Sequence, residues 1–118
     1  MIVERGQVIN ARFPHASGTR GKKRPVVVIQ ADIYNQRLRH VVVAQITTNL
    51  DDKEDPACFL IEASTPEGQA AGFARDSLFS GYLISLMRED RLQDVIGKLT
   101  DEAMRKADGC LKVALGLG

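Results

Sequence analysis

The sequence RFPHASGTRGKKRPVVVIQ, residues 12–30, decides the fold because it contains two strand patterns separated by a polar, cationic loop. Pro14 ends the first pattern, since proline has no N–H to donate to a neighbouring strand. Pro25 opens the second pattern, an apolar run over residues 26–29, and keeps Arg24 before it out of the helical region. This stretch therefore predicts two strands, with an arginine held rigidly at the start of a buried one.

The loop between the two patterns is strongly positive. Arg20, Lys22 and Lys23 lie close to Arg24 in the sequence. Arginine presents a planar fork of donors that suits phosphate and does not lose its charge near neutral pH. On these residues alone a solvated turn is the commoner explanation, and the functional alternative is an anion-binding site.

The composition is that of an ordinary globular protein. With 118 residues, 44% hydrophobic and 26% charged, the chain is expected to form one domain over residues 1–118. The net charge of +1 hides an asymmetry. Residues 1–45 contain eight Lys/Arg and two Asp/Glu, whereas residues 46–118 contain eight Lys/Arg and thirteen Asp/Glu. This division is compatible with an anionic ligand on one face.

The cysteines and the absence of targeting patterns favour the cytoplasm. Cys58 and Cys110 lie in apolar contexts and are expected to be reduced and buried rather than disulfide-bonded. They lack the spacing of metal ligands, and we expect neither a metal nor a cofactor. No secretory signal is expected, and no apolar run approaches membrane-spanning length.

The remaining patterns predict a mainly β fold that ends in helices. Further strands are expected over residues 40–49, 58–61 and 75–86, with a bulge or bend at Gly81. Residues 31–35 are expected to form a loop or one helical turn, 50–56 an exposed charged loop, and 64–74 an irregular connection. Residues 92–99 carry apolar side chains at helical spacing, and a second helix should begin at the N-cap Thr100. The order favours a small, bent antiparallel sheet or partly open barrel with the last helix packed across it.

Alternation assigns the faces of these elements. In the strand over residues 40–49, Val42, Ala44 and Ile46 are expected on the core face, while Val41, Val43, Gln45 and Thr47 point the other way. The expected buried stripe of the last helix consists of Ala103, Met104, Ala107, Cys110, Leu111, Ala114 and Leu115.

The usual catalytic motifs are missing, so chemistry has to come from simpler groups. Arg24 begins one strand and Thr47 ends the next, and joined antiparallel strands place such ends close together. An arginine and a hydroxyl at one anion site suit phosphoryl chemistry, and RNA supplies its own 2′-OH as nucleophile. His15 beside the loop is a candidate general acid or base, although a lone loop histidine is more often simply exposed.

The joint pattern resembles the MazF/PemK family of toxin endoribonucleases. It consists of GQV at 6–8, GKKRPVVVIQ at 21–30, VVAQITT at 42–48, RDS at 75–77, DRL at 90–92 and IGKL at 96–99. The resemblance implies an SH3-like barrel of the PemK/CcdB type with a C-terminal helix. It also implies a homodimer, a cognate antitoxin as partner, and metal-independent cleavage of single-stranded RNA to a 2′,3′-cyclic phosphate and a 5′-OH.

The resemblance also implies roles for single residues. Arg24 would be the acid or the cation that stabilises the transition state, and Thr47 would orient the phosphate. Substrate-binding positions are expected at Arg20, Lys22, Lys23, Thr48, Ser77 and His15. The chain departs from better-known members at Thr19-Arg20, where they carry Glu-Gln, and at residues 82–86, where they carry an acidic-Gln-x-Arg-Thr segment.

Two other functions share this fold. A gyrase-poisoning toxin of the CcdB type depends on a terminal Trp-Gly-Ile, whereas this chain has no tryptophan and reads Gly-Leu-Gly at residues 116–118. The second is an inactive barrel that only binds antitoxin or RNA.

Overall fold

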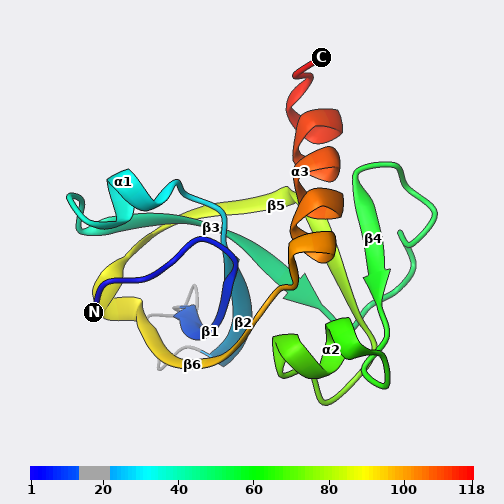
Figure 1. The fold of residues 1–118 in the computed structure, drawn as a ribbon, viewed down its shortest axis with the longest axis horizontal. Helices are drawn as coiled ribbons and strands as arrows, with labels where there is room; N and C mark the ends of the chain where they lie inside the picture. The colour runs from blue at the N-terminus through cyan, green and yellow to red at the C-terminus, as the bar shows by residue number, and fades with distance from the viewer. Residues whose placement is uncertain (14–21) are drawn as a thin grey trace.

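A computed structural model describes residues 1–13 and 22–118, and it contains a six-stranded sheet of order β4-β5-β3-β2-β1-β6 (Figure 1). All neighbouring strands are antiparallel. The elements in chain order are β1 (Gln7–Phe13), β2 (Lys22–Val28), α1 (Asp32–Asn35), β3 (His40–Thr47), β4 (Cys58–Ile61), α2 (Pro66–Ala71), β5 (Ser77–Arg88), a 3₁₀ turn (Glu89–Arg91), β6 (Leu92–Lys98) and α3 (Asp101–Leu115).

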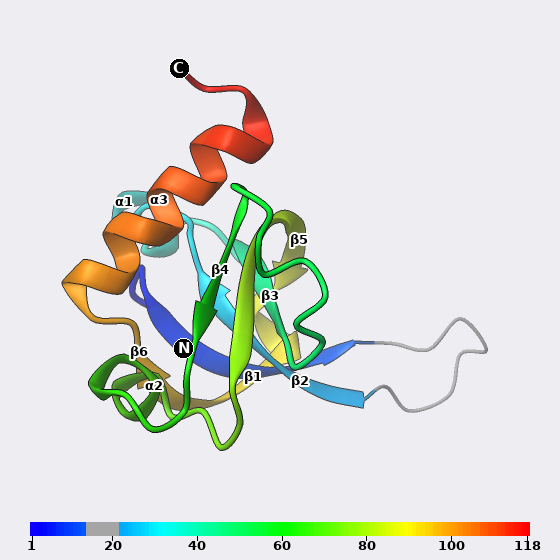
Figure 2. The ribbon, with the colours of Figure 1, turned by 90° about the vertical axis from the view of Figure 1, so that its right-hand side faces the viewer.

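The sheet is strongly curved but not closed. Figures 1 and 2 show β1, β2 and β6 curling round toward the long strand β5, with α3 packed across the other side of the sheet. The outer strands β4 and β6 are not paired with each other, so this is a partly open barrel. The predicted mainly β fold with a C-terminal helix is confirmed.

The sheet is buried on both sides because two apolar clusters cover its two faces. In β2, Val27 belongs to one cluster, whereas Val26 and Val28 belong to the other. The first cluster lies beneath α3 and contains Val8, Val27, Ala44, Ile46, Ile61, Ala71, Phe73, Phe79, Leu99, Ala103, Ala107 and Cys110. The second fills the concave side and contains Val3, Ile9, Ala11, Val26, Val28, Val41, Val43, Met87 and Leu92.

Burial on both sides corrects the assignment of faces in β3. Ala44 and Ile46 are buried beneath α3 as expected, but Val41 and Val43 on the opposite face are also buried, at 2% and 0% exposure. Val42 is only half-buried. Alternation correctly separated the two faces, but it could not show that the second face has a core of its own.

The prediction of a helix over residues 92–99 is wrong. Residues Leu92–Lys98 form β6, which pairs with β1 and completes the concave side of the sheet. The β1–β6 ladder contains two register shifts, so its apolar residues do not alternate regularly. The irregular spacing of Leu92, Val95, Ile96 and Leu99 thereby imitates the period of a helix.

The segment expected to be irregular over residues 64–74 contains helix α2. Thr65 is its N-cap and accepts from the Gly68 N–H at 3.2 Å, and Pro66 occupies the first turn. Gly72 ends the helix with φ of +78°, a left-handed conformation that favours glycine. Residues 31–35 were expected to form a loop or one helical turn, and they contain the helical turn α1. The charged loop before β4 is exposed.

The last helix follows the sequence closely. Thr100 caps α3 by accepting from the Ala103 N–H at 3.1 Å, and Asp101 and Glu102 lie in its first turn. Ala103, Ala107 and Cys110 are buried, while Met104, Leu111 and Ala114 are half-buried. Leu115, expected on the buried stripe, is instead 56% exposed. The helix extends beyond the sheet at this end, as Figure 2 shows, so its last turn has no apolar surface to pack on.

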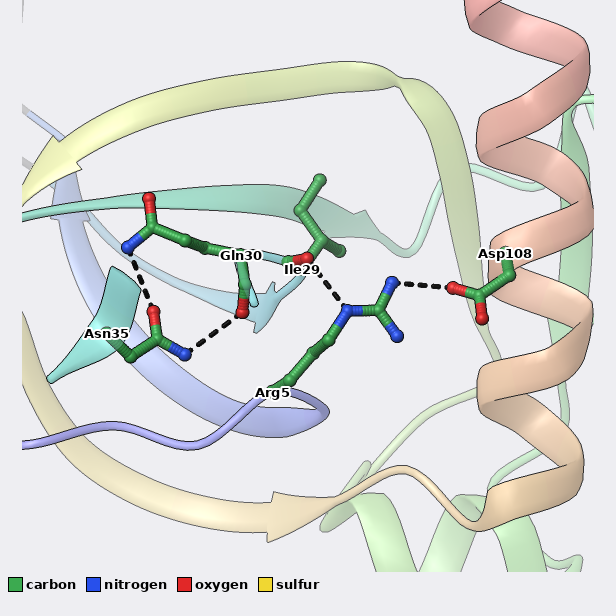
Figure 3. A network of polar contacts seen from close by, with 5 residues as sticks. All are labelled: Arg5, Ile29, Gln30, Asn35 and Asp108. Atoms are coloured by element: carbon green, nitrogen blue, oxygen red, sulfur yellow. Dashed lines mark hydrogen bonds and ion pairs between the residues drawn. The ribbon is translucent and has the colours of Figure 1, made fainter. Parts of the chain in front are cut away.

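A polar network attaches α1 and α3 to the sheet (Figure 3). Arg5 donates from Nη2 to Asp108 of α3 at 2.6 Å and from Nε to the Ile29 carbonyl at 2.9 Å. Gln30 and Asn35 exchange two hydrogen bonds, of 2.9 and 3.0 Å, which hold α1 against the end of β2. The N-terminal segment thus connects the sheet to the C-terminal helix.

No helix within residues 1–13 and 22–118 is long and apolar enough to cross a membrane. Both cysteines are buried and free, as expected.

Candidate active site

The cationic segment is part of a strand. β2 begins at Lys22, three residues before the predicted start, and pairs with β1 so that Ala11 lies opposite Arg24 and Arg12 opposite Lys23. Successive side chains of a strand point to opposite faces. Arg24 therefore shares the concave face with Val26 and Val28, and its own side chain is exposed at the end of that face.

The faces of the sheet place Arg24 and Thr47 on the same side. β2 and β3 pair with Val26 opposite Gln45 and Val28 opposite Val43, and the recorded pairs end at Val26 and Gln45. Alternation along each strand puts Arg24 on the face of Val26 and Thr47 on the face of Val43, which is the concave face. Thr47 also pairs with Leu78 of β5. The arrangement presents a guanidinium and a hydroxyl at the end of one face.

Lys23 lies on the opposite face from Arg24. Its Nζ is 3.6 Å from the Asp94 carboxylate of β6, which also accepts from Asn10 Nδ2 at 3.0 Å. The hydrogen bond from Asn10, helped by the charge of Lys23, holds the pKa of Asp94 below its usual value. Lys22 is exposed and alternates onto the same face as Arg24.

The other predicted positions are more scattered. Thr47 Oγ1 accepts from the Asn49 N–H at 3.1 Å, and Thr48 is exposed. Ser77 is 4% exposed and donates to the Arg75 carbonyl at 2.8 Å, so its hydroxyl is engaged within the protein. Its role in substrate binding stays a prediction. His15 and Arg20 lie outside the described residues.

A hollow beside Thr47 was not among the features expected from the sequence. This hollow, of about 150 Å³, is lined by Thr47, Asn49, Asp52, Leu78, Ser80, Tyr82 and Leu83. The β3–β5 ladder is irregular here: Ala44 pairs with Ile84 but Ile46 pairs with Phe79, so β5 bulges around Gly81. The predicted bulge or bend at Gly81 is confirmed. Gly81 was the sequence feature that could have indicated the hollow, because bulges often reposition side chains near functional sites.

Tyr82 is fixed at the edge of this hollow. Its hydroxyl donates to Asp52 Oδ2 at 2.7 Å, and Cys58 Sγ lies within hydrogen-bond distance of the same hydroxyl, at 3.5 Å. The hydrogen bond with Cys58, and then that with Asp52, raise the pKa of Tyr82 well above its ordinary value.

Within the part of the chain that the structure describes, no three His, Cys, Asp or Glu side chains gather in a way that could hold a metal ion. The groups that line the hollow beside Thr47 are instead hydroxyls, an amide and a carboxylate, and the exposed Arg24 side chain lies on the same face of the sheet as Thr47. Such a set can bind and polarise a phosphate and form hydrogen bonds to a polar ligand beside it.

Comparison with known proteins places this geometry in a family. A family model described as "PemK-like, MazF-like toxin of type II toxin-antitoxin system" matches residues 4–115. The chain belongs to this family. Endoribonuclease EndoA of Bacillus subtilis is 37% identical over 118 residues, which cover 99% of this chain and 97% of the relative.

Solved structures of PemK/MazF toxins share the fold. An endoribonuclease in complex with its cognate antitoxin, from a mycobacterial species, superposes with a TM-score of 0.79 at 22% identity over 98% of this chain and 97% of the other. A MazE–MazF structure from Deinococcus radiodurans gives 0.76 at 14% identity over the whole of both chains. The expected family and its architecture are therefore confirmed.

Proposed function

We propose that the chain is an endoribonuclease toxin that cleaves single-stranded mRNA by transesterification, with Arg24 and Thr47 acting on the scissile phosphate. The single observation that supports the proposal is that the β2–β3 pairing and strand alternation put Arg24 and Thr47 on the same, concave face of a PemK/MazF fold. Curated relatives over the full chain are named endoribonucleases, which leaves the gyrase-poisoning alternative without support.

The reaction requires little from the protein. The 2′-OH attacks the adjacent phosphorus, so a bond forms between O2′ and phosphorus and the bond from phosphorus to O5′ breaks. The 2′-OH proton passes to a base, and O5′ leaves as a hydroxyl after protonation. Arg24 stabilises the charge on the phosphoryl oxygens or protonates O5′, and Thr47 orients the phosphate. Since the RNA provides the nucleophile, the proposed mechanism uses no metal.

Neighbouring cations on β2 provide a matched test. Purified protein is incubated with a long single-stranded RNA in EDTA, and initial rates are compared for the wild type, Arg24→Ala and Lys23→Ala. We expect Arg24→Ala to lose about 10²- to 10³-fold, as removal of a charge-stabilising donor does in other enzymes. Lys23→Ala, which changes a cation on the opposite face with a predicted role in substrate binding alone, should stay within about threefold when RNA is in excess, as expected for an exposed pair.

Thr47→Val removes the hydroxyl with little change in volume and should also slow cleavage. Cleavage by Arg24→Ala at the rate of Lys23→Ala would remove Arg24 from the mechanism. Absence of cleavage by the wild type over varied RNAs would favour the inactive-barrel alternative, in which the fold only binds RNA or antitoxin.

We also propose that the chain, as one toxin domain over residues 1–118, forms a homodimer in the cytoplasm and is neutralised by a cognate antitoxin. Antitoxin complexes of structurally similar proteins support the last point. A groove of about 440 Å³ beside the end of α3, lined partly by Ile29, Val42 and Leu115, supports a self-association surface. Light scattering of Leu115→Asp against wild type tests the dimer: the variant should be monomeric at concentrations where the wild type is dimeric.

A further inference from the structure

The hollow beside Thr47 contains a polar group that the fold leaves unsatisfied. Ser80 is 1% exposed, and although its hydroxyl lies close enough to the Tyr82 hydroxyl to oppose the rise in the pKa of Tyr82, its Oγ makes no hydrogen bond of adequate geometry with any residue that the structure describes. A buried hydroxyl without a partner is unfavourable, and native proteins usually reserve such groups for a ligand or an ordered water. Ser80 lines the hollow together with Thr47, so a molecule in the hollow can reach both.

The wall of the hollow is an aromatic ring held in position. Tyr82 lines it and is 46% exposed, which leaves part of the ring free for contact. The 2.7 Å hydrogen bond to Asp52 fixes the end of the ring. A fixed, partly exposed aromatic ring is the usual platform on which proteins stack single-stranded bases. Leu78 and Leu83 supply the apolar remainder.

Other polar groups surround the same space. Asn49 Oδ1 accepts from the Asp51 N–H at 2.9 Å, and this bond directs the side-chain amide, whose NH₂ supplies two donors. The Asp52 carboxylate is an acceptor, and the Ser80 hydroxyl can either donate or accept. A ligand that fits must therefore combine a flat ring with hydrogen-bonding groups along its edge, which is the chemistry of a nucleobase.

We propose that this hollow binds one pyrimidine base of the RNA strand, stacked on Tyr82 and hydrogen-bonded by Ser80. This inference rests on the proposed function, because it assigns a base-selecting site next to the phosphate at Thr47. A cavity of about 150 Å³ accommodates a benzene-sized ring in another protein. A six-membered pyrimidine therefore fits within the hollow, whereas a two-ring purine would extend beyond it and leave part of its surface uncovered.

The tyrosines of this chain allow a direct binding test. The chain has no tryptophan and two tyrosines, so Tyr34→Phe leaves Tyr82 as the only tyrosine fluorophore. Oligonucleotides of 2′-deoxyuridine and of 2′-deoxyadenosine lack the 2′-OH and cannot be cleaved by transesterification. We expect the uridine oligomer to quench Tyr82 fluorescence saturably, at a concentration roughly tenfold below that required of the adenosine oligomer, as expected for one well-stacked base.

The second part of the binding test concerns the Ser80 hydroxyl. Ser80→Ala in the Tyr34→Phe background should weaken binding of the uridine oligomer about three- to tenfold, which is the range for one lost hydrogen bond. It should leave binding of the adenosine oligomer unchanged. Ser64→Ala, at an exposed serine before α2, is the matched control and should change neither. Urea unfolding of each variant confirms that the fold is kept.

The outcomes separate this inference from the proposed function. Equal quenching by both oligomers, no quenching by either, or no effect of Ser80→Ala would overturn the pyrimidine site, with Ser80 then satisfied by water only. RNA cleavage that depends on Arg24 would survive that result. Conversely, selective quenching by uridine without cleavage of any RNA would support the pocket and overturn the assignment of catalysis.

Discussion

Gly81 is predicted to be required because α3 approaches β5 too closely for any side chain. A Cβ at this position would lie 2.6 Å from the Cys110 carbonyl oxygen, 2.8 Å from its carbon and 3.1 Å from the Leu111 nitrogen. Ordinary contacts begin near 3.4 Å, so Gly81→Ala is short of space by about 0.8 Å. The obstructing atoms belong to a helix backbone, which cannot rotate out of the way.

The expected loss follows from this overlap. Overpacking of a rigid site destabilises by about 1–3 kcal/mol, because α3 must move away from β5. For a domain of this size that corresponds to a fall in melting temperature of roughly 4 °C for each kcal/mol. Since Gly81 does not adopt a positive φ, backbone strain does not contribute and the whole effect is steric.

Gly109→Ala is the matched control, because Gly109 lies on the exposed side of α3 and a methyl group there would have no atom within 4 Å. The same chemical change there should stabilise by about 0.5–1 kcal/mol through helix propensity. Urea unfolding followed by circular dichroism gives both free energies, provided that the m-values agree. The reasoning is refuted if Gly81→Ala is as stable as wild type or if both substitutions shift stability in the same direction.

Three further predictions concern stability. Hydrogen bonds from the Arg5 N–H, and then from Asn35, lower the pKa of Asp32. Asp32 therefore stabilises the fold above its unfolded pKa of about 3.9, and this contribution is lost as the pH falls through the lower folded value. Asp32→Asn should flatten the pH dependence of urea unfolding below about pH 4; an unchanged profile would contradict this. Phe79→Ala, at a side chain with 0% exposure, should lose about 3–5 kcal/mol by calorimetry, and a loss under about 1 kcal/mol would show that the site collapses around the cavity. Thr100→Ala should lose about 1 kcal/mol by removal of the N-cap, while Thr100→Ser should retain most of it.

Elements defined by their own local chemistry were predictable. β1 ends before a proline, β4 coincides with its short apolar run, and α3 begins directly after its N-cap Thr100, with two acidic residues in its first turn. In each case the signal lies within a few residues of the element that it specifies. Distant parts of the chain reinforce such elements without changing them.

Elements shaped by distant contacts were not predictable. β6 resembles a helix in the sequence because its bulges against β1 disturb the alternation. α2 carries an N-cap and a C-terminal glycine, but Gly68 within it resembles a turn residue. The structure explains this glycine, because a Cβ there would collide with the backbone of Glu62 and Ala63.

The residues of the candidate site also differ in how far the sequence could predict them. Arg24 and Thr47 could be selected from the sequence because antiparallel pairing of β2 with β3 and simple alternation put both on one face, and their joint role stays a prediction. Lys23 could not be separated from Arg24, since only the observed start of β2 assigns the two cations to opposite faces. The substrate-binding role of Ser77 remains a prediction. Its hydroxyl is buried and donates to the Arg75 carbonyl, so a bound substrate would have to replace that partner.

The sequence by itself determined five of the six strands, the terminal helix and the pair of residues proposed to act on phosphate, because periodicity, prolines and caps operate over a few residues. Only the tertiary structure decided that the sheet has two cores, that residues 92–98 form a strand, and that Ser80, Tyr82 and Asp52 surround one hollow. The physical reason is that bulges and burial depend on what packs from elsewhere in the chain. A bulge around Gly81 changes which side chains face the site, and no local pattern encodes its partner across the sheet.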